Sequence, residues 1–138
     1  MKTLFLDAGY LITLEAADDQ NHQAAFSHWQ KLLQTPPQII TTTYIFDEIV
    51  TFFNNRNRHA KAVEIGNNLL QSGFIEMIQV DEDLLESGWN YFQKHDDKRY
   101  SLTDCISFVV MKQRNLDSAL SFDRHFTQAG FIKLPNNE

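Results

Sequence analysis

Short apolar runs alternate with longer amphipathic stretches along the chain, and this alternation predicts strands separated by helices. The first run, Thr3–Leu6, is short, largely apolar and stops at Asp7, which is typical of a buried parallel strand. Similar runs predict further strands at residues 38–43, 74–80 and 118–122, with an edge strand at 131–134.

Between these runs, apolar residues recur at the spacing of a helix with one buried face. Helices are predicted over residues 21–33, 44–53, 60–70, 81–93 and 101–113. Residues 7–9 are predicted to form a turn, and residues 124–130 a short connection. Strands that alternate with helices imply right-handed crossovers and a parallel sheet. The predicted fold class is therefore α/β: a three-layer α/β/α sandwich around a mostly parallel sheet of four to five strands, in one domain spanning residues 1–138.

The segment 101–113 differs from the other helices because it is almost wholly apolar after its first turn. A helix that is apolar on all sides is a buried one. Asp104 lies in its first turn, where the helix dipole and free backbone N–H groups stabilise a carboxylate. Ser101 and Asp104 also have the spacing of a capping box, so a purely structural role is an alternative for this aspartate.

Two further aspartates follow predicted strands directly. Asp7 stands at the carboxyl end of the first strand and Asp123 at the end of the strand 118–122. Ligands of open parallel sheets bind outside these carboxyl ends. Each residue also has a simpler interpretation, since Asp7 can cap the next helical turn and Asp123 can end a strand.

Glu48 is distinguished from its neighbour Asp47 by its position on the predicted helix 44–53. Ile45 and Ile49 define the apolar face of this helix, with Phe52 and Phe53. Asp47 points nearly opposite that face and is expected to be solvated, whereas Glu48 lies at the border and can reach inward to a cleft.

Gathered carboxylates repel one another and resist ionisation when they are buried. A hard divalent cation resolves this conflict, because Mg²⁺ and Mn²⁺ take oxygen ligands. The sequence therefore predicts a metal site made of Asp7, Glu48, Asp104 and Asp123, of the kind that assists phosphoryl transfer.

Overall composition limits the function classes. The net charge is −6 at pH 7, which argues against a protein that coats nucleic acid by charge alone. The single cysteine, Cys105, cannot form an internal disulfide and fits a reducing compartment. No signal peptide is apparent, and no apolar run approaches the roughly 20 residues needed to cross a bilayer. A cytoplasmic location without membrane association is expected.

The order of these motifs resembles that of PIN domain ribonucleases, in particular those of the VapC toxin type. The similarity rests on a strand ending in Asp7, on Glu48 in a helix, on the stretch Leu102-Thr-Asp-Cys-Ile-Ser-Phe, and on the block Ala119-Leu-Ser-Phe-Asp-Arg-His-Phe-Thr-Gln-Ala-Gly-Phe131. One departure is that Ala8 and Gly9 follow Asp7, where many members carry a hydroxyl residue.

The resemblance implies an endoribonuclease, a hydrolase that cleaves single-stranded RNA with Mg²⁺ or Mn²⁺ as its cofactor. Asp7, Glu48, Asp104 and Asp123 would form the acidic cluster, and Thr103 would support it by hydrogen bonding. Such proteins commonly form homodimers and are silenced by a small antitoxin. Positive side chains that suit RNA contact are Arg56, Lys94, Lys98 and Arg99.

Two alternatives to a ribonuclease are compatible with parts of this pattern. A PIN-fold domain that binds RNA or acts as a scaffold would keep the architecture without turnover. A haloacid-dehalogenase-like phosphatase also begins with a strand that ends in a nucleophilic aspartate. That family resembles Asp-x-Asp at this point, but Gly9 occupies the second position here, so the general acid is missing.

Overall fold

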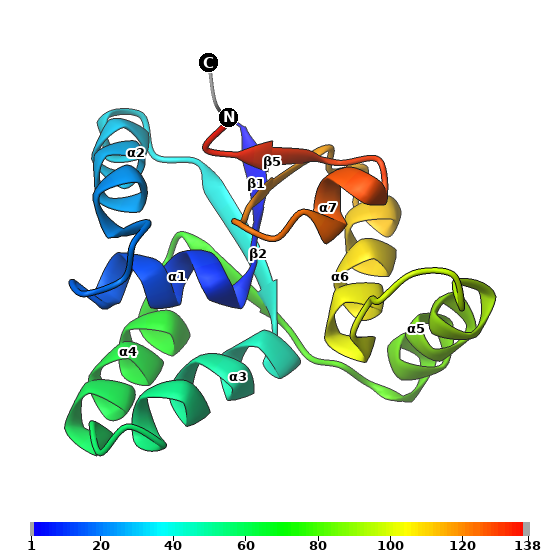
Figure 1. The fold of residues 1–138 in the computed structure, drawn as a ribbon, viewed down its shortest axis with the longest axis horizontal. Helices are drawn as coiled ribbons and strands as arrows, with labels where there is room; N and C mark the ends of the chain where they lie inside the picture. Colours follow the sequence, from blue (N-terminus) through cyan, green and yellow to red (C-terminus); the bar gives the residue numbers. More distant parts are fainter. Residues whose placement is uncertain (1, 137–138) are drawn as a thin grey trace.

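Five parallel strands form one sheet at the centre of the structure, a computed structural model that describes residues 2–136. The order across the sheet is β3-β2-β1-β4-β5. Figure 1 shows the sheet between two groups of helices, so the predicted three-layer α/β/α class is confirmed. The strand bounds are Thr3–Leu6 (β1), Gln38–Thr42 (β2), Ile75–Ile78 (β3), Ser118–Leu120 (β4) and Ile132–Leu134 (β5).

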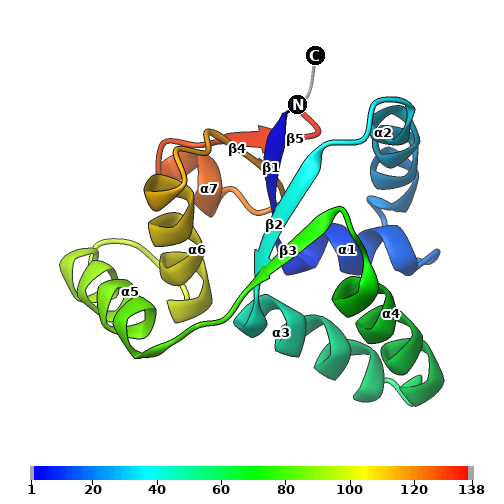
Figure 2. The same cartoon turned by 180° about the vertical axis from the view of Figure 1, so that it is seen from behind.

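The helices divide between the two faces of the sheet. Helices α1 to α4 lie on one side, and α5, α6 and α7 lie on the other, as the views from front and back agree (Figures 1 and 2). Their bounds are Ala8–Glu15 (α1), His22–Gln34 (α2), Thr43–Asn54 (α3), His59–Gln71 (α4), Glu82–Lys94 (α5), Leu102–Gln113 (α6) and His125–Gln128 (α7).

β1 is the central strand of the sheet. The next two strands in the sequence, β2 and β3, lie on one side of it, and β4 and β5 lie on the other. β1 pairs in parallel with β2 through Phe5 and Ile40, and with β4 through Phe5 and Ala119. Strand order therefore reverses around β1, which is the position where open α/β sheets bind ligands beyond the carboxyl ends of their strands. Asp7 occupies that position.

Aromatic side chains make up much of the core between the sheet and α6. Phe5, Phe108 and Phe126 are fully buried, and the rings of Phe108 and Phe126 meet edge to face with centroids 5.0 Å apart. As predicted, α6 is buried on nearly every side, including Cys105. Because α6 is locked into the core, the first turn that carries Asp104 has little freedom to move.

Helices α5 and α6 approach each other closely at Gly88. A Cβ atom built on Gly88 would lie 2.5 Å from Cγ1 of Ile106 and 3.3 Å from its Cα. The missing side chain thus allows α5 to rest directly on the backbone of α6, and this contact supports the helix that presents Asp104.

Two short helices were not predicted. The expected turn at residues 7–9 is wrong, because α1 begins at Ala8 with Asp7 as its N-cap. The residues of α1 are mostly buried, so the helix lacks the polar face that marks an amphipathic segment. The connection 124–130 contains α7, whose four residues are too few to show a helical repeat.

The described part of the chain contains no helix that combines the length and the apolar character required to span a lipid bilayer.

Candidate active site

Four carboxylates from separate parts of the chain line one cavity at the carboxyl edge of the sheet. The cavity has a volume of about 430 Å³. Its wall includes the four acids predicted from the sequence, which are Asp7, Glu48, Asp104 and Asp123. The folded chain therefore gathers residues that are up to 116 positions apart (123 − 7).

Asp7 is fixed at the junction of β1 and α1. Its backbone N–H donates to the carbonyl of Leu120 at 3.0 Å, which extends the pairing of β1 with β4. The buried Ser121 hydroxyl donates to Oδ2 of Asp7 at 2.9 Å. Ser121 thus supplies a hydroxyl partner for Asp7 although none follows Asp7 in the sequence.

Asp104 has the structural role that its position in the sequence allows, and it also lines the acidic cavity. Its backbone N–H donates to the Ser101 hydroxyl at 3.0 Å, and its Oδ2 accepts the Ser101 N–H at 3.2 Å, so the capping box is formed. The same Oδ2 contacts Nδ1 of His125 at 3.0 Å. Its Oδ1 has no hydrogen-bond partner among residues 2–136 and remains available to a ligand.

Asp123 and His125 complete the opposite wall of the cavity. The Asp123 N–H donates to the Ser121 hydroxyl at 3.0 Å, and Oδ1 of Asp123 accepts the His125 N–H at 2.9 Å. Nδ1 of His125 also lies 3.3 Å from Oδ1 of Asp123. Ligand atoms of Asp104, Asp123 and His125 all lie within 4.8 Å of one another, a spacing at which one metal ion can contact them together.

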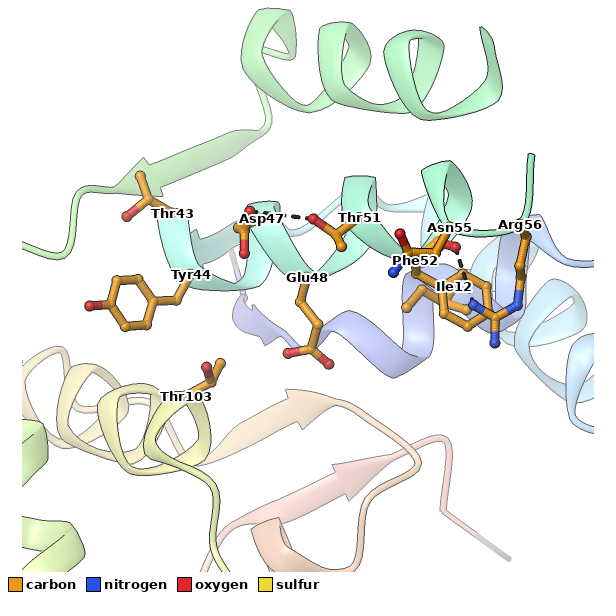
Figure 3. Close-up of a pocket in the computed structure, with 10 residues that line it drawn as sticks. All are labelled: Ile12, Thr43, Tyr44, Asp47, Glu48, Thr51, Phe52, Asn55, Arg56 and Thr103. Carbon is orange, nitrogen blue, oxygen red and sulfur yellow. Dashed lines mark hydrogen bonds between the residues drawn. The ribbon is translucent and has the colours of Figure 1, made fainter. Parts of the chain in front are cut away.

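Glu48 lies on α3 and contributes its carboxylate to the acidic cavity from that helix. It lines both the acidic cavity and a larger groove of about 710 Å³ that runs along α3. Figure 3 shows Glu48 extending from α3 toward Thr103 on α6, whereas the carboxylate of Asp47 is turned toward Thr51. The Thr51 hydroxyl donates to Asp47 at 3.4 Å. Glu48 rather than Asp47 therefore belongs to the acidic cluster, as the helical spacing predicted.

Burial and repulsion between carboxylates make Asp7, Glu48 and Asp104 hard to ionise. Burial, partly offset by the Ser121 hydrogen bond, raises the pKa of Asp7 from 3.8 to about 7, and repulsion from the other acids adds to it. Burial first, and then repulsion from Asp104 and Asp123, raise the pKa of Glu48. Burial also raises the pKa of Asp104, against the hydrogen bonds from His125 and Ser101. A positive ion in the cavity would relieve this repulsion.

The donor set fits a hard divalent cation. Four carboxylates offer oxygen ligands, and a bound cation would remove the repulsion that adds to the effect of burial on the pKa values of Asp7 and Glu48. Asp104 and Asp123 have ligand atoms within 4.8 Å of one another, with the His125 nitrogen beside them. When bound, such an ion activates water for attack and neutralises charge on a phosphate.

The other predicted residues are distributed more widely. Thr103 lines the groove along α3 near Glu48, and its hydroxyl forms no hydrogen bond among residues 2–136, so its supporting role stays a prediction. Arg56 lines the far end of that groove and lies over the Phe52 ring at 3.6 Å.

Of the basic residues before α6, only Arg99 reaches the acidic cavity within the described structure. Lys98 lines a neighbouring cavity and is paired with Asp97 at 3.1 Å. Lys94 lies exposed in the last turn of α5 and lines neither cavity.

Ser121 was not among the predicted site residues, and His125 was expected to be a surface residue rather than a substrate contact. Ser121 lies two residues before Asp123, and its hydroxyl accepts the Asp123 N–H just after the end of β4. That spacing is a usable signal, because Ser121 bonds both Asp7 and the backbone of Asp123. His125 had no such signal, since its contact with Asp104 depends on the turn into α7.

The fold and the site define an open parallel α/β protein with an acidic cavity at the switch in strand order, the position where such sheets bind ligands. The sequence profile of the PIN domain matches residues 4–132. The chain therefore belongs to the PIN domain family.

One curated relative is the 23S rRNA-specific endonuclease VapC20 of Mycobacterium tuberculosis (strain CDC 1551 / Oshkosh). It is 31% identical over 131 residues, which cover 95% of this chain and 97% of the relative. The crystal structure of M. tuberculosis VapC20, a sarcin-ricin loop cleaving toxin, has a TM-score of 0.84 at 30% identity. The match covers 94% of this chain and 96% of that one.

A more distant solved structure shares the fold alone. VapBC2 from Rickettsia felis, solved bound to a DNA fragment from its promoter, has a TM-score of 0.64 at 10% identity. That match covers 95% of this chain and 96% of the other.

Proposed function

We propose that this protein is a toxin of a toxin–antitoxin pair that cleaves RNA with the help of Mg²⁺ or Mn²⁺. The observation that carries the proposal is the convergence of Asp7, Glu48, Asp104 and Asp123 on one cavity. Repulsion from the neighbouring acids, which adds to the effect of burial in raising the pKa of Asp7, supports the proposal because a cation in the cavity would relieve it. Membership of the PIN domain family and the likeness to VapC20 support the nuclease reaction.

The substrate we infer is the sarcin-ricin loop of 23S ribosomal RNA, cut where its strand is unpaired. This inference rests on VapC20, which is described as specific for 23S rRNA and as cleaving that loop. Identity of 31% across nearly the full length of both chains supports a shared substrate class. We infer hydrolysis of a phosphodiester bond inside the RNA.

Each residue of the site would have a distinct task. Asp104 and Asp123 would hold the ion, with Asp7 and Glu48 as further oxygen donors on the same cavity. Ser121 would keep Asp7 and the backbone of Asp123 in register through its two hydrogen bonds. His125 would orient Asp104 and Asp123, and Thr103 would face the substrate from the groove beside Glu48.

Two kinds of protein contact belong to the proposal. A small antitoxin would occupy the cleft, which is supported by the fold shared with VapBC2 of R. felis. A homodimer is supported by α5, where Leu85, Trp89 and Phe92 form an exposed apolar stripe and the rings of the last two stack 5.3 Å apart. We infer action on ribosomes in the cytoplasm, by one domain without membrane association.

The test is cleavage of purified ribosomes and of a synthetic sarcin-ricin stem-loop in Mg²⁺ or Mn²⁺. We expect one specific cut, abolished by EDTA and by Asp104→Asn. Far-UV circular dichroism would check that the variant is folded. Equal cleavage by the variant and the parent would identify a contaminating nuclease and contradict the proposal. RNA binding by the parent without any cleavage would instead support a silent RNA-binding domain.

A further inference from the structure

A second cavity adjoins the acidic one, and its charge is opposite. It has a volume of about 470 Å³ and is bounded by the chain before α6 and by α7. Arg99 and His125 line both cavities, so the two share a wall. The lining residues are Asp97, Lys98, Arg99, Arg124, His125 and Gln128.

Two guanidinium groups in this basic cavity have no partner within the described chain. Arg99 and Arg124 are exposed, and neither side chain forms an ion pair or a hydrogen bond among residues 2–136. Lys98 differs, because its ammonium group is paired with Asp97 at 3.1 Å. The cavity therefore offers two free positive charges in a protein whose net charge is −6.

The backbone of Arg124 is held beside the acidic residues. Arg124 lies between Asp123 and His125, whose backbone N–H is bonded to Asp123 at 2.9 Å. The His125 ring is held against Asp104 at 3.0 Å and forms the partition between the cavities. The acidic and basic cavities are thus parts of one rigid arrangement, not independent surface features.

We propose that the basic cavity binds the phosphodiester group next to the one that is cut, in a single strand of RNA. This inference rests on the proposed nuclease function. RNA carries one negative charge per nucleotide, and an acidic wall repels every phosphate that is not neutralised by the ion. Guanidinium groups match phosphate oxygens in a two-pronged geometry that a lysine ammonium lacks. The RNA strand therefore leaves the acidic cavity across His125 and is held by Arg99 and Arg124.

Binding measurements separate this proposal from the proposed catalysis. The probe is a fluorescein-labelled single-stranded 12-mer RNA, titrated by fluorescence anisotropy against full-length protein carrying Asp104→Asn, which prevents turnover. The test variant adds Arg99→Gln and Arg124→Gln. The matched control instead adds Lys2→Gln and Lys31→Gln. Both lysines are exposed and lie outside the site, so these substitutions remove the same amount of positive charge. Lys2 precedes β1, at the end of that strand opposite Asp7.

We expect the arginine variant to bind the RNA about tenfold or more weakly than its parent, since it loses charge-assisted hydrogen bonds to a phosphate. The slope of log affinity against log salt should also fall by roughly 0.7, the contribution of one single-strand phosphate. The lysine control should retain the parent's affinity and slope. Both arginines are exposed and unpaired among residues 2–136, so thermal melting should show an unchanged fold.

Three results would overturn the proposal. The arginine variant could bind RNA like the parent, or the lysine control could lose as much affinity as the arginine variant. A poly-glutamate peptide could also bind in an arginine-dependent way while RNA does not, which would assign the cavity to an acidic protein partner. Absence of cleavage by the wild type, with arginine-dependent RNA binding intact, would reject the nuclease function and keep the phosphate site.

Discussion

The hydroxyl of Ser121 donates a hydrogen bond of 2.9 Å to Oδ2 of Asp7, which joins the ends of two neighbouring strands across 114 residues of sequence. The same hydroxyl accepts the backbone N–H of Asp123 at 3.0 Å. One buried side chain therefore aligns two of the four carboxylates, and the geometry of the acidic cavity depends on this alignment.

Replacing Ser121 with alanine should weaken both the fold and the site. The change leaves the Asp123 N–H and an oxygen of Asp7 without a partner, which should lower the free energy of unfolding by about 1–2 kcal/mol. Urea denaturation measures this loss, and a Mn²⁺ titration should show weaker binding. Ser118→Ala is the matched control, because Ser118 is buried at the other end of β4 and its hydroxyl bonds only Asp117 among residues 2–136. Equal Mn²⁺ affinity in both variants would contradict the assigned role.

Divalent ions should stabilise the protein through the acidic cavity. Saturating Mn²⁺ should raise the melting temperature by about 5 °C, because an ion that binds only the folded state shifts the unfolding equilibrium. Asp104→Asn and Glu48→Gln should reduce this rise strongly. Asp47→Asn should keep it, since Asp47 is turned toward Thr51 and away from the cluster (Figure 3). A rise that survives in all three variants would place the ion elsewhere.

Stability without metal should fall as pH rises. The pKa of Asp7 is about 7 in the folded chain, against an ordinary value of 3.8, so the folded state holds its proton more tightly than the unfolded state. The stabilisation is complete below about pH 4 and is lost as pH rises toward 7. Each tenfold difference in proton affinity between the two states corresponds to roughly 1.4 kcal/mol, so the loss is on the order of 4 kcal/mol.

Asp7→Asn removes the titration of this one carboxylate. In EDTA, the free energy of unfolding of this variant should overtake that of the wild type between pH 4 and pH 7, and Mn²⁺ should reverse the order at pH 8. The exposed Asp18→Asn controls for the loss of one negative charge. Parallel pH curves for the wild type and Asp7→Asn would refute the assignment.

The contact between α5 and α6 should be sensitive to one methyl group. In Gly88→Ala the new Cβ would lie 2.5 Å from Cγ1 of Ile106 and 3.3 Å from its Cα, so the two helices must separate. Overpacking outweighs the gain in helix propensity, and we expect a net loss of about 1–2 kcal/mol in chemical denaturation. Gly9→Ala is the control, because no atom lies within 4 Å of the added Cβ. A stabilised Gly88→Ala protein would show that the helices part without cost.

The fold class, the buried helix and the four acidic residues could be predicted because each follows from a pattern that is local in the sequence. The alternation of strands and helices gave the α/β class, and the apolar run after Asp104 gave the buried helix. Helical spacing separated Glu48 from Asp47 because the direction of a side chain on a helix depends only on its neighbours. Strand ends placed Asp7 and Asp123 at one edge because parallel strands end together.

What could not be predicted depends on contacts between distant segments. The His125 ring reaches Asp104 only because α7 turns back beside α6, and four residues are too few to predict that turn. The buried helix α1 was missed for a related reason, since a short apolar segment does not reveal its period. The position of Arg124 beside the acidic cavity could not be predicted either, because it depends on how α7 and the chain before α6 come together in the fold.

The central position of β1 means that the carboxylates of the site differ in how firmly they are held. Asp7 follows a strand that is hydrogen-bonded on both sides, and its carboxylate is tied to Ser121. Glu48 projects from an exposed stretch of α3 and has no hydrogen-bond partner among residues 2–136. In the proposed metal site, rotation of Glu48 would therefore accommodate a cation of larger or smaller radius, while Asp7 would stay in place.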